Sequence, residues 1–423
     1  MTCTNQAPGA PNCLAVADVN GDGLLDLISP NASVNTLLVF TNKGNGTFAA
    51  STNYPVGSAP YWVTAADVNR DGKVDLISAN AGANTLTVLT NDGSGGFRTN
   101  GTYAVGLSPR CVIAADIDGS GRLALISANH DAGTLTVLTN NGNGVFGSNA
   151  TCVVGVNPVV VIAADINGNG RPALISANFN PANTLSIYTN NGSGVFGSNA
   201  TINAGLLLSS VVAADVYGKG KPDLVCANYS DHTLLVFTNN GSGRFGSNAT
   251  VNVGLTLTWG TAADLNGDGK AELIAVLNYA EVLAVYTNSA SGVFALSGSY
   301  GVGSHPNNNY PVYAAVADLN NDGKPDLISV NYFDNTLSVL TNTTAFPAPA
   351  STPTPIIRRA GSELLVSWPT VSAGWSLQQT AGLTNKNWTP GGFNGYGIAD
   401  DGTNKSLAIA VPIGNSFFRL LHP

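Results

Sequence analysis

An aspartate-rich loop recurs along this chain at a nearly constant interval, and this repeat constrains the fold more than any other feature. Seven segments read D-x-N-x-D-G-x-x-D or a degenerate form of it, and their first aspartates are Asp18, Asp67, Asp116, Asp165, Asp215, Asp264 and Asp318. Successive loops are 49, 49, 49, 50, 49 and 54 residues apart. A fixed period of this size is typical of a repeat architecture, in which each unit packs against its neighbours. Seven copies of one unit therefore fill residues 1–345.

Each repeat contains four short stretches with the composition of strands. In the second repeat, WVTAAD, VDLISA and TLTVLT are rich in Val, Ile, Leu and Thr, and TNGTYAVG follows a glycine-rich turn. Turn residues separate these stretches, as expected for neighbouring strands. Four strands per unit and seven units predict an all-β fold, a seven-bladed β-propeller. A solenoid of the same units would need polar capping repeats, and none is visible in the sequence.

The repeat resembles a known family. The segment ADVNGDGLLDLISPN, followed by NTLLVFTNKGNGTF, is similar to the FG-GAP or VCBS repeat of integrin alpha-subunit propellers and of many secreted bacterial proteins. The resemblance recurs in every unit and covers about four-fifths of the chain. It implies that the Asp loops join first to second strands on the lower face, here termed the Asp-loop face. The loops joining second to third strands, and each fourth strand to the next first, would lie on the upper face, here termed the opposite face.

The seventh repeat lacks a fourth strand of its own, because TTAFPAPASTPTP follows its third strand. We expect Met1–Pro8 to supply the missing strand, as the N-terminus does in closed propellers. The alternative is that a neighbouring chain covers the open edge by strand addition.

Four Asp loops carry a complete set of oxygen ligands for calcium, a cation that prefers six to eight oxygens. Positions 1, 3, 5 and 9 supply carboxylate or amide oxygens, position 7 supplies a carbonyl, and glycine at position 6 permits the turn. About four Ca²⁺ sites are therefore predicted, in blades 1, 2, 6 and 7, held by Asp18, Asn20, Asp22, Asp26, Asp67, Asn69, Asp71, Asp75, Asp264, Asn266, Asp268, Glu272, Asp318, Asn320, Asp322 and Asp326. The alternative is an Asp-rich turn that bonds to its own backbone.

The three middle loops are degenerate. Blade 3 has Ser120 and Ala124 at ligand positions, blade 4 has Ala173, and blade 5 has Tyr217 and Lys219. The Lys219 ammonium could replace an ion there. Since blades 6, 7, 1 and 2 are neighbours in a closed ring, the predicted sites form one arc. Their role would be structural, and the weak affinity usual for extracellular calcium modules fits a location outside the cell or at its surface.

Composition excludes several classes of function. Charged residues make up 10% of the chain and the formal net charge is −8, which argues against a nucleic-acid partner. No run of 18 apolar residues is present, so no membrane span is expected, and the first residues do not resemble a signal peptide. The four histidines have no metal-ligand spacing, and no hydrolase or nucleotide-binding motif is present, so the protein is not expected to be an enzyme.

Aromatic residues are expected on the opposite face. Trp62, Trp259 and Tyr313 share one register, five residues before the loop aspartate, and the loops between second and third strands add Tyr229, Tyr279 and Tyr332. The same loops contain Asp231, Glu281 and Asp334, and aromatic rings beside carboxylates suit sugar or peptide binding. The alternative is that rings at the mouth of a channel only plug it.

Two further features have open readings. Sequons in the outermost strands make Asn100, Asn149, Asn199 and Asn248 candidate glycosylation sites, although duplication of an Asn-rich segment is the favoured explanation of their register. Cys3 and Cys13 are close enough in sequence to form a disulfide, or both are buried thiols.

The end of the chain has a different composition. Residues 346–358 are rich in Pro, Ala, Ser and Thr, as in a semi-rigid linker. Within residues 359–423, SELLVSW, WSLQQT, LAIAVPI and SFFRLL predict a small β-sandwich. This segment resembles a β module that ends many secreted proteins of Verrucomicrobia-like bacteria, which implies a role in attachment.

These features predict a secreted, calcium-binding, non-catalytic propeller that serves in adhesion or as a structural subunit of an extracellular surface assembly or filament. Self-association would use strand complementation or the C-terminal module, and the other expected partner is a glycan or surface protein. The alternative function is a carbohydrate-binding lectin that uses the aromatic upper face.

Overall fold

The computed structural model describes residues 2–7, 9, 11–44, 47–49, 52–289, 293–303, 310–344 and 346, together with seven strands between residues 356 and 421. The chain divides into two units, Met1–Thr344 and Ala345–Pro423. All described regular structure is β, and no helix within it has the length and hydrophobicity of a membrane span.

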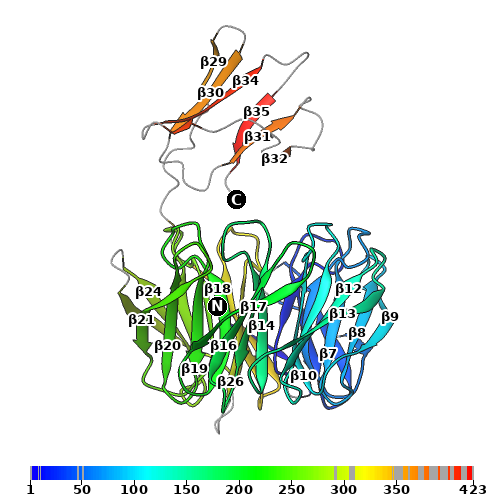
Figure 1. Ribbon diagram of the computed structural model, residues 1–423. Helices are drawn as coiled ribbons and strands as arrows, with labels where there is room; N and C mark the ends of the chain where they lie inside the picture. The colour runs from blue at the N-terminus through cyan, green and yellow to red at the C-terminus, as the bar shows by residue number, and fades with distance from the viewer. Residues whose placement is uncertain are drawn as a thin grey trace. The chain divides into compact units, whose positions relative to one another are not determined.

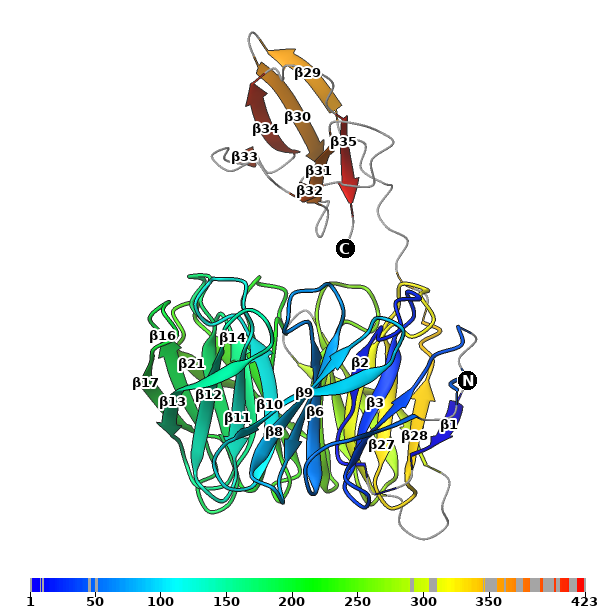
Figure 2. The ribbon, with the colours of Figure 1, turned by 90° about the vertical axis from the view of Figure 1, so that its right-hand side faces the viewer.

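The first unit is a ring of seven four-stranded antiparallel sheets, which confirms the predicted seven-bladed propeller (Figures 1 and 2). Within each blade the strands follow in sequence order from the ring's centre to its rim, with one exception in blade 7. The strands of blades 1 to 4 are β2 (Ala15–Ala17), β3 (Asp26–Asn31), β4 (Thr36–Phe40), β5 (Thr52–Pro55); β6 (Pro60–Ala66), β7 (Asp75–Asn80), β8 (Thr85–Asn91), β9 (Phe97–Ala104); β10 (Pro109–Ala115), β11 (Ala124–Asn129), β12 (Thr134–Asn140), β13 (Phe146–Val153); and β14 (Pro158–Ala164), β15 (Ala173–Asn178), β16 (Thr184–Asn190), β17 (Phe196–Asn203). Those of blades 5 to 7 are β18 (Leu208–Ala214), β19 (Asp223–Asn228), β20 (Thr233–Asn239), β21 (Phe245–Asn252); β22 (Leu257–Ala263), β23 (Glu272–Leu277), β24 (Val282–Asn288), β25 (Phe294–Gly301); and β26 (Pro311–Ala317), β27 (Asp326–Asn331), β28 (Thr336–Leu340), β1 (Thr2–Gln6).

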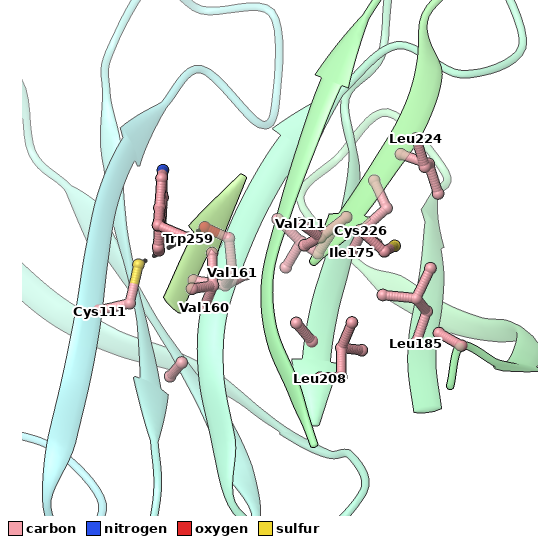
Figure 3. Close-up of a cluster of buried hydrophobic side chains, with 14 of the residues drawn as sticks. Cys111, Val160, Val161, Ile175, Leu185, Leu208, Val211, Leu224, Cys226 and Trp259 are labelled. Carbon is pink, nitrogen blue, oxygen red and sulfur yellow. Dashed lines mark hydrogen bonds between the residues drawn. The ribbon is translucent and has the colours of Figure 1, made fainter. Parts of the chain in front are cut away.

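The strand sequences reflect their depth in each blade. Every residue of β7 (DLISAN) is buried, because this second strand is sandwiched between neighbouring blades, and its buried polar side chains Asp75, Ser78 and Asn80 are hydrogen-bonded. The outermost strand β9 is mostly exposed and reads FRTNGTYA. The core therefore lies between blades rather than at one centre, and its largest cluster extends from blade 3 to blade 7. Figure 3 shows part of it, with Val160 and Val161 of β14 beside Val211 of β18.

The chain's own N-terminus closes the ring, as expected. Strand β1 pairs antiparallel with β28, from Thr2 opposite Leu340 to Gln6 opposite Thr336. The fourth strand of blade 7 is thus supplied in cis, and the edge of β28 is covered (Figure 2).

An asparagine joins each blade to the preceding one. Asn140, near the Asp-loop face end of β12, donates its amide to the Val68 carbonyl of blade 2 at 2.7 Å and to the Leu123 carbonyl of its own blade at 3.1 Å. The equivalent amide of blade 1, Asn42, reaches the Leu319 carbonyl of blade 7 at 2.8 Å. Corresponding inter-blade bonds come from Asn91, Asn190, Asn239, Asn288 and Asn342. These seven residues, the clamp asparagines, link all blades into a continuous ring.

The second unit contains two small sheets. One has the order β29 (Ile356–Ala360), β30 (Glu363–Pro369), β34 (Asn404–Ala410), β33 (Ala399–Asp400), and the other β32 (Thr389–Pro390), β31 (Ser376–Thr380), β35 (Phe417–Leu421). The four predicted strands are present. The predicted linker, 346–358, is too long, because Ile356 is already paired with Ser367.

Candidate functional site

The first carboxylate of each Asp loop organises the turn. In blade 1, Asp18 accepts hydrogen bonds from the N–H groups of Gly21 at 2.7 Å and Gly23 at 2.8 Å, while Asn20 accepts one from Asp22 at 2.9 Å. Gly23 has φ of 85°, and its equivalents in the other loops have φ between 69° and 81°, a region that favours glycine. The glycine at position 6 is therefore required in all seven turns, whether or not a metal binds.

The carboxylate at position 9 is buried and links two strands. Both oxygens of Asp26 accept backbone bonds, one from Val19 at 3.0 Å and one from the clamp residue Asn42 at 2.8 Å. Burial raises the pKa of Asp26, and the charges of Asp22 and Asp18 raise it further, although the two N–H groups oppose the shift. Asp75, Glu272 and Asp326 show the same pattern with their own loop carboxylates.

The oxygen donors of blades 1, 2, 6 and 7 are of the kind that a hard dication prefers. In each of these loops the charges at positions 1 and 5 help to raise the pKa of the position 9 carboxyl, and a bound cation would offset that repulsion. The polar groups of the loop also bond to one another, since the Asn20 amide nitrogen donates to Asp22 at 2.9 Å. Among the described residues no three acidic, His or Cys side chains are already arranged around a metal position.

In two of the degenerate loops a cationic side chain interacts with a loop carboxylate. In blade 3, Arg122 forms an ion pair with Asp118 at 3.5 Å. In blade 5, the Lys219 charge lowers the pKa of Asp223, against the dominant effect of burial, and the ammonium lies 5.1 Å from the centre of the Tyr217 ring.

The three aromatic residues that share a register meet inside the ring. Trp259 and Tyr313 have ring centroids 4.6 Å apart, and Trp62 lies 5.8 Å from Trp259 and 5.6 Å from Tyr313. Trp259 is only 8% exposed, and burial raises the pKa of Tyr313. Figure 3 shows Trp259 near Cys111 and Val160 of other blades. These rings, here called the plug, meet across the channel, and a separate cavity of about 510 Å³ is lined mainly by first-strand residues, including Trp259 and Tyr313.

Above the plug, one residue from each blade lines a cavity of about 260 Å³ on the opposite face, which we call the bowl. These residues lie six positions before each loop aspartate: Asn12, Tyr61, Arg110, Val159, Ser209, Thr258 and Val312. In blades 2 to 7 each is the extra residue of a β-bulge at the start of the first strand. Since a bulge redirects its side chain, the repeat itself aims seven variable side chains at one point. Sequence reasoning missed this ring, although its constant offset was a usable signal.

Trp62, Trp259 and Val160 of the layer below complete the bowl together with Phe179 and Tyr229 from the loops. Of the six predicted ligand-binding residues, Trp62, Trp259 and Tyr229 therefore line the cavity. Tyr279 and Tyr332 belong to a neighbouring aromatic cluster. The ring centroids of Tyr279 and Tyr310 are 5.3 Å apart, and those of Tyr332 and Phe333 are 4.9 Å apart. Tyr313 lies in the plug.

The candidate glycosylation sites differ from one another. Asn199 is exposed on β17, whereas the side-chain amide of Asn100 on β9 donates to the Gly144 carbonyl at 2.7 Å. The side chains of Asn149 and Asn248 lie outside the described residues. Cys13 is a free, fully buried thiol, while the side chain of Cys3 is also outside the described residues.

The sequence matches the FG-GAP-like repeat family six times, over residues 18–78, 67–127, 116–176, 165–225, 215–275 and 264–329. Each match begins at the first aspartate of an Asp loop and extends into the next blade. No curated protein matches the sequence.

Several solved structures share the fold at low identity. BBS1N in complex with ARL6DN has a TM-score of 0.60 at 12% identity, covering 81% of this chain and 97% of that chain. A protein from Lactobacillus plantarum has a TM-score of 0.53 at 14% identity, covering 69% and 84%. A Bacteroides fragilis NCTC 9343 protein provisionally assigned as a 6-phosphogluconolactonase has a TM-score of 0.54 at 14% identity, also covering 69% and 84%. At these identities the likeness concerns the fold alone.

Proposed function

Because this chain belongs to the FG-GAP-like repeat family, we propose that it is a non-catalytic recognition module for adhesion outside the cell, with its ligand site in the bowl. The observation that carries this proposal is the ring of bulged residues. A repeat that directs one side chain per blade into a common cavity, while the residue type differs between blades, is suited to building a specific binding site.

The chemistry of the bowl supports binding rather than catalysis. Ser209 donates its hydroxyl proton to the Ala227 carbonyl at 3.2 Å, and Thr258 donates to the Pro311 carbonyl at 2.9 Å. Each hydroxyl is thus held by the backbone and not by a general base. The described lining residues include no carboxylate and no histidine.

Calcium belongs to the same proposal as a structural component of the Asp-loop face. Asp18, Asn20, Asp22 and Asp26 would hold the ion in blade 1, and the equivalent residues in blades 2, 6 and 7. When bound, the ion would supply the positive charge that these carboxylates lack, and would stiffen the turns at one end of each blade. Its binding would also fit a location where calcium is abundant.

One argument for the filament hypothesis no longer applies. The hypothesis partly relied on an incomplete seventh blade, and β1 fills that position in cis. Self-association through the C-terminal unit remains a separate hypothesis. The bowl favours the recognition of an external ligand instead, including the glycan that the lectin alternative specifies.

The test is to fill the bowl without disturbing the core. Ser209→Trp places a large side chain in the cavity, whereas Ser242→Trp puts the same residue on an exposed turn at the Asp-loop face end of the same blade. On an array of glycans and extracellular-matrix proteins, the wild-type protein and Ser242→Trp should retain binding that Ser209→Trp loses. Equal binding by all three would contradict a bowl site. Trp62 and Trp259 are unsuitable for this test, because replacing plug residues also disrupts the core.

A further inference from the structure

We propose that the bowl selects a carboxylate-bearing pyranose, such as a terminal uronic acid, and that Arg110 is the residue that selects the charge. This inference rests on the proposed function and specifies its ligand class. Arg110 comes from the bulge at the start of β10, and it is the one charged side chain among the described residues that line the bowl.

The Arg110 guanidinium is held in place but lacks an anionic partner at ion-pair distance. Its central carbon lies over Tyr61, 5.3 Å from the ring centroid, and its charge opposes the rise that burial causes in the pKa of Tyr61. Asp131, in the loop after β11, pairs with His130 at 2.6 Å. This bond chiefly lowers the pKa of Asp131, and the Arg110 charge lowers it further, so Asp131 is the carboxylate that Arg110 interacts with at longer range. No described carboxylate lies within 4.0 Å of Arg110. A partly buried guanidinium whose N–H groups contact no described carboxylate can still bind a bidentate anion.

The other polar groups of the bowl are mainly acceptors. Because Ser209 and Thr258 donate their protons to backbone carbonyls, their oxygens remain to accept hydrogen bonds from a ligand. Tyr229 is already engaged with Tyr279 through its hydroxyl, while Asn12 offers both a donor and an acceptor. Hydroxyl groups of a sugar would satisfy these acceptors.

An acidic peptide would fit less well. A glutamate side chain could pair with Arg110, but its carboxylate and methylene groups cannot donate to Ser209 or Thr258, so donors would have to come from backbone N–H groups, one for each residue. Burying acceptors without donors is costly. A uronic acid combines one carboxylate with several hydroxyl donors, and Trp62 and Trp259 offer aromatic surface to the apolar face of its ring. The cavity of about 260 Å³ is small for a ligand pocket and suits a single ring.

The experiment compares matched sugars by calorimetric titration. Methyl uronides of gluco, galacto and manno configuration are each paired with the neutral methyl pyranoside of the same configuration, and an end-blocked glutamate dipeptide is included. The proteins are wild type, Arg110→Gln, Arg110→Lys and Arg98→Gln. Arg98 is exposed on the outer strand β9 and controls for loss of one positive charge. Thermal unfolding checks that each variant is folded, and Ser209→Trp blocks the site while leaving Arg110 intact.

At least one uronide should bind about 10- to 100-fold more tightly than its neutral partner, since a hydrogen-bonded charge pair has this effect on affinity. Arg110→Gln should remove the difference, Arg110→Lys should retain part of it, and Arg98→Gln should leave it unchanged. Equal affinity for both members of every pair, or an unaffected Arg110→Gln protein, overturns the proposal. Dipeptide binding that exceeds uronide binding and depends on Arg110 overturns the sugar class.

The experiment separates this inference from the proposed function. Neutral sugars that bind in the wild type and are blocked by Ser209→Trp would leave a recognition bowl without charge selection. If no sugar or dipeptide binds, and the array also shows no ligand that Ser209→Trp removes, both proposals fail.

Discussion

At the scale of single residues, the clamp asparagines connect neighbouring blades through side-chain hydrogen bonds. Each donates to a carbonyl of the preceding blade, and all are buried except the half-buried Asn342. In blades 1, 2, 5 and 7 the backbone N–H also binds the carboxylate at position 9. Blade 3 isolates the first role, because Ala124 occupies position 9 there. The amide of Asn140 must satisfy two carbonyls by itself.

Asn140→Ala should therefore lower the free energy of unfolding by about 1–3 kcal/mol for each carbonyl left unsatisfied. Its neighbour Asn141 is an ideal control, since it is exposed and bonds only within its own turn. Asn141→Ala should change stability by about 0.5 kcal/mol or less. Urea denaturation of the two variants measures the difference, and similar midpoints would show that the inter-blade bond contributes little.

The spacing of the clamp asparagines is visible in the sequence, but their role is not. An asparagine follows each loop aspartate after 24 residues, or 25 in blade 4. Because asparagine is common in turns, this spacing alone does not distinguish an inter-blade contact from a turn. Arg110 could not be singled out from the sequence for a similar reason. The ligand-binding hypothesis used the aromatic residues of the next register position, and these form the plug. Period and alternation predicted the blades and their strands. They could not show which side of a bulge faces the cavity, because a bulge interrupts the alternation.

At the scale of the element, the Asp loop combines a turn with a metal site, and the blades separate the two roles. Asp223 of blade 5 retains the position 9 contact to Asn239 at 2.9 Å although Tyr217 and Lys219 occupy ligand positions. Blade 5 thus keeps the strand connection and the glycine turn. Only the oxygen ligands at positions 3 and 5 are missing.

Restoring those two ligands should create a calcium site. Tyr217→Asn with Lys219→Asp gives blade 5 the ligand pattern of blade 7, and calorimetric titration should show one more bound ion than in the wild type. With a dissociation constant of about 0.1–1 mM, 10 mM calcium should stabilise the double variant by about 1.4–2.7 kcal/mol more than the wild type.

The single variant Tyr217→Asn, which retains Lys219, should gain no ion. In the opposite direction, Asp71→Lys should remove one ion by placing a cation in blade 2 as Lys219 does in blade 5. An unchanged number of ions in both the double variant and Asp71→Lys would mean that these loops are turns only.

At the scale of the whole molecule, closure of the ring determines whether the propeller exposes an unpaired strand edge to other chains. The ring is closed by strand β1 on the outside and by the bond from Asn42 to the Leu319 carbonyl further in. The second contact does not involve the N-terminal strand. Blades 7 and 1 should therefore stay together when β1 is lost, but β28 would then present an unpaired edge, which is a template for strand addition.

Deleting residues 1–6 should thus leave a folded propeller that self-associates. Light scattering should show dimers or larger species for the deletion variant at concentrations where the full chain is monomeric. A synthetic TCTNQA peptide should restore the monomer by pairing with β28, as donor strands do in other sheets, while a scrambled peptide of the same composition should not. If the deletion variant stays monomeric and gains nothing from the peptide, β1 is dispensable for covering the edge. If it unfolds outright, the outer strand rather than the inner Asn42 contact holds the ring closed.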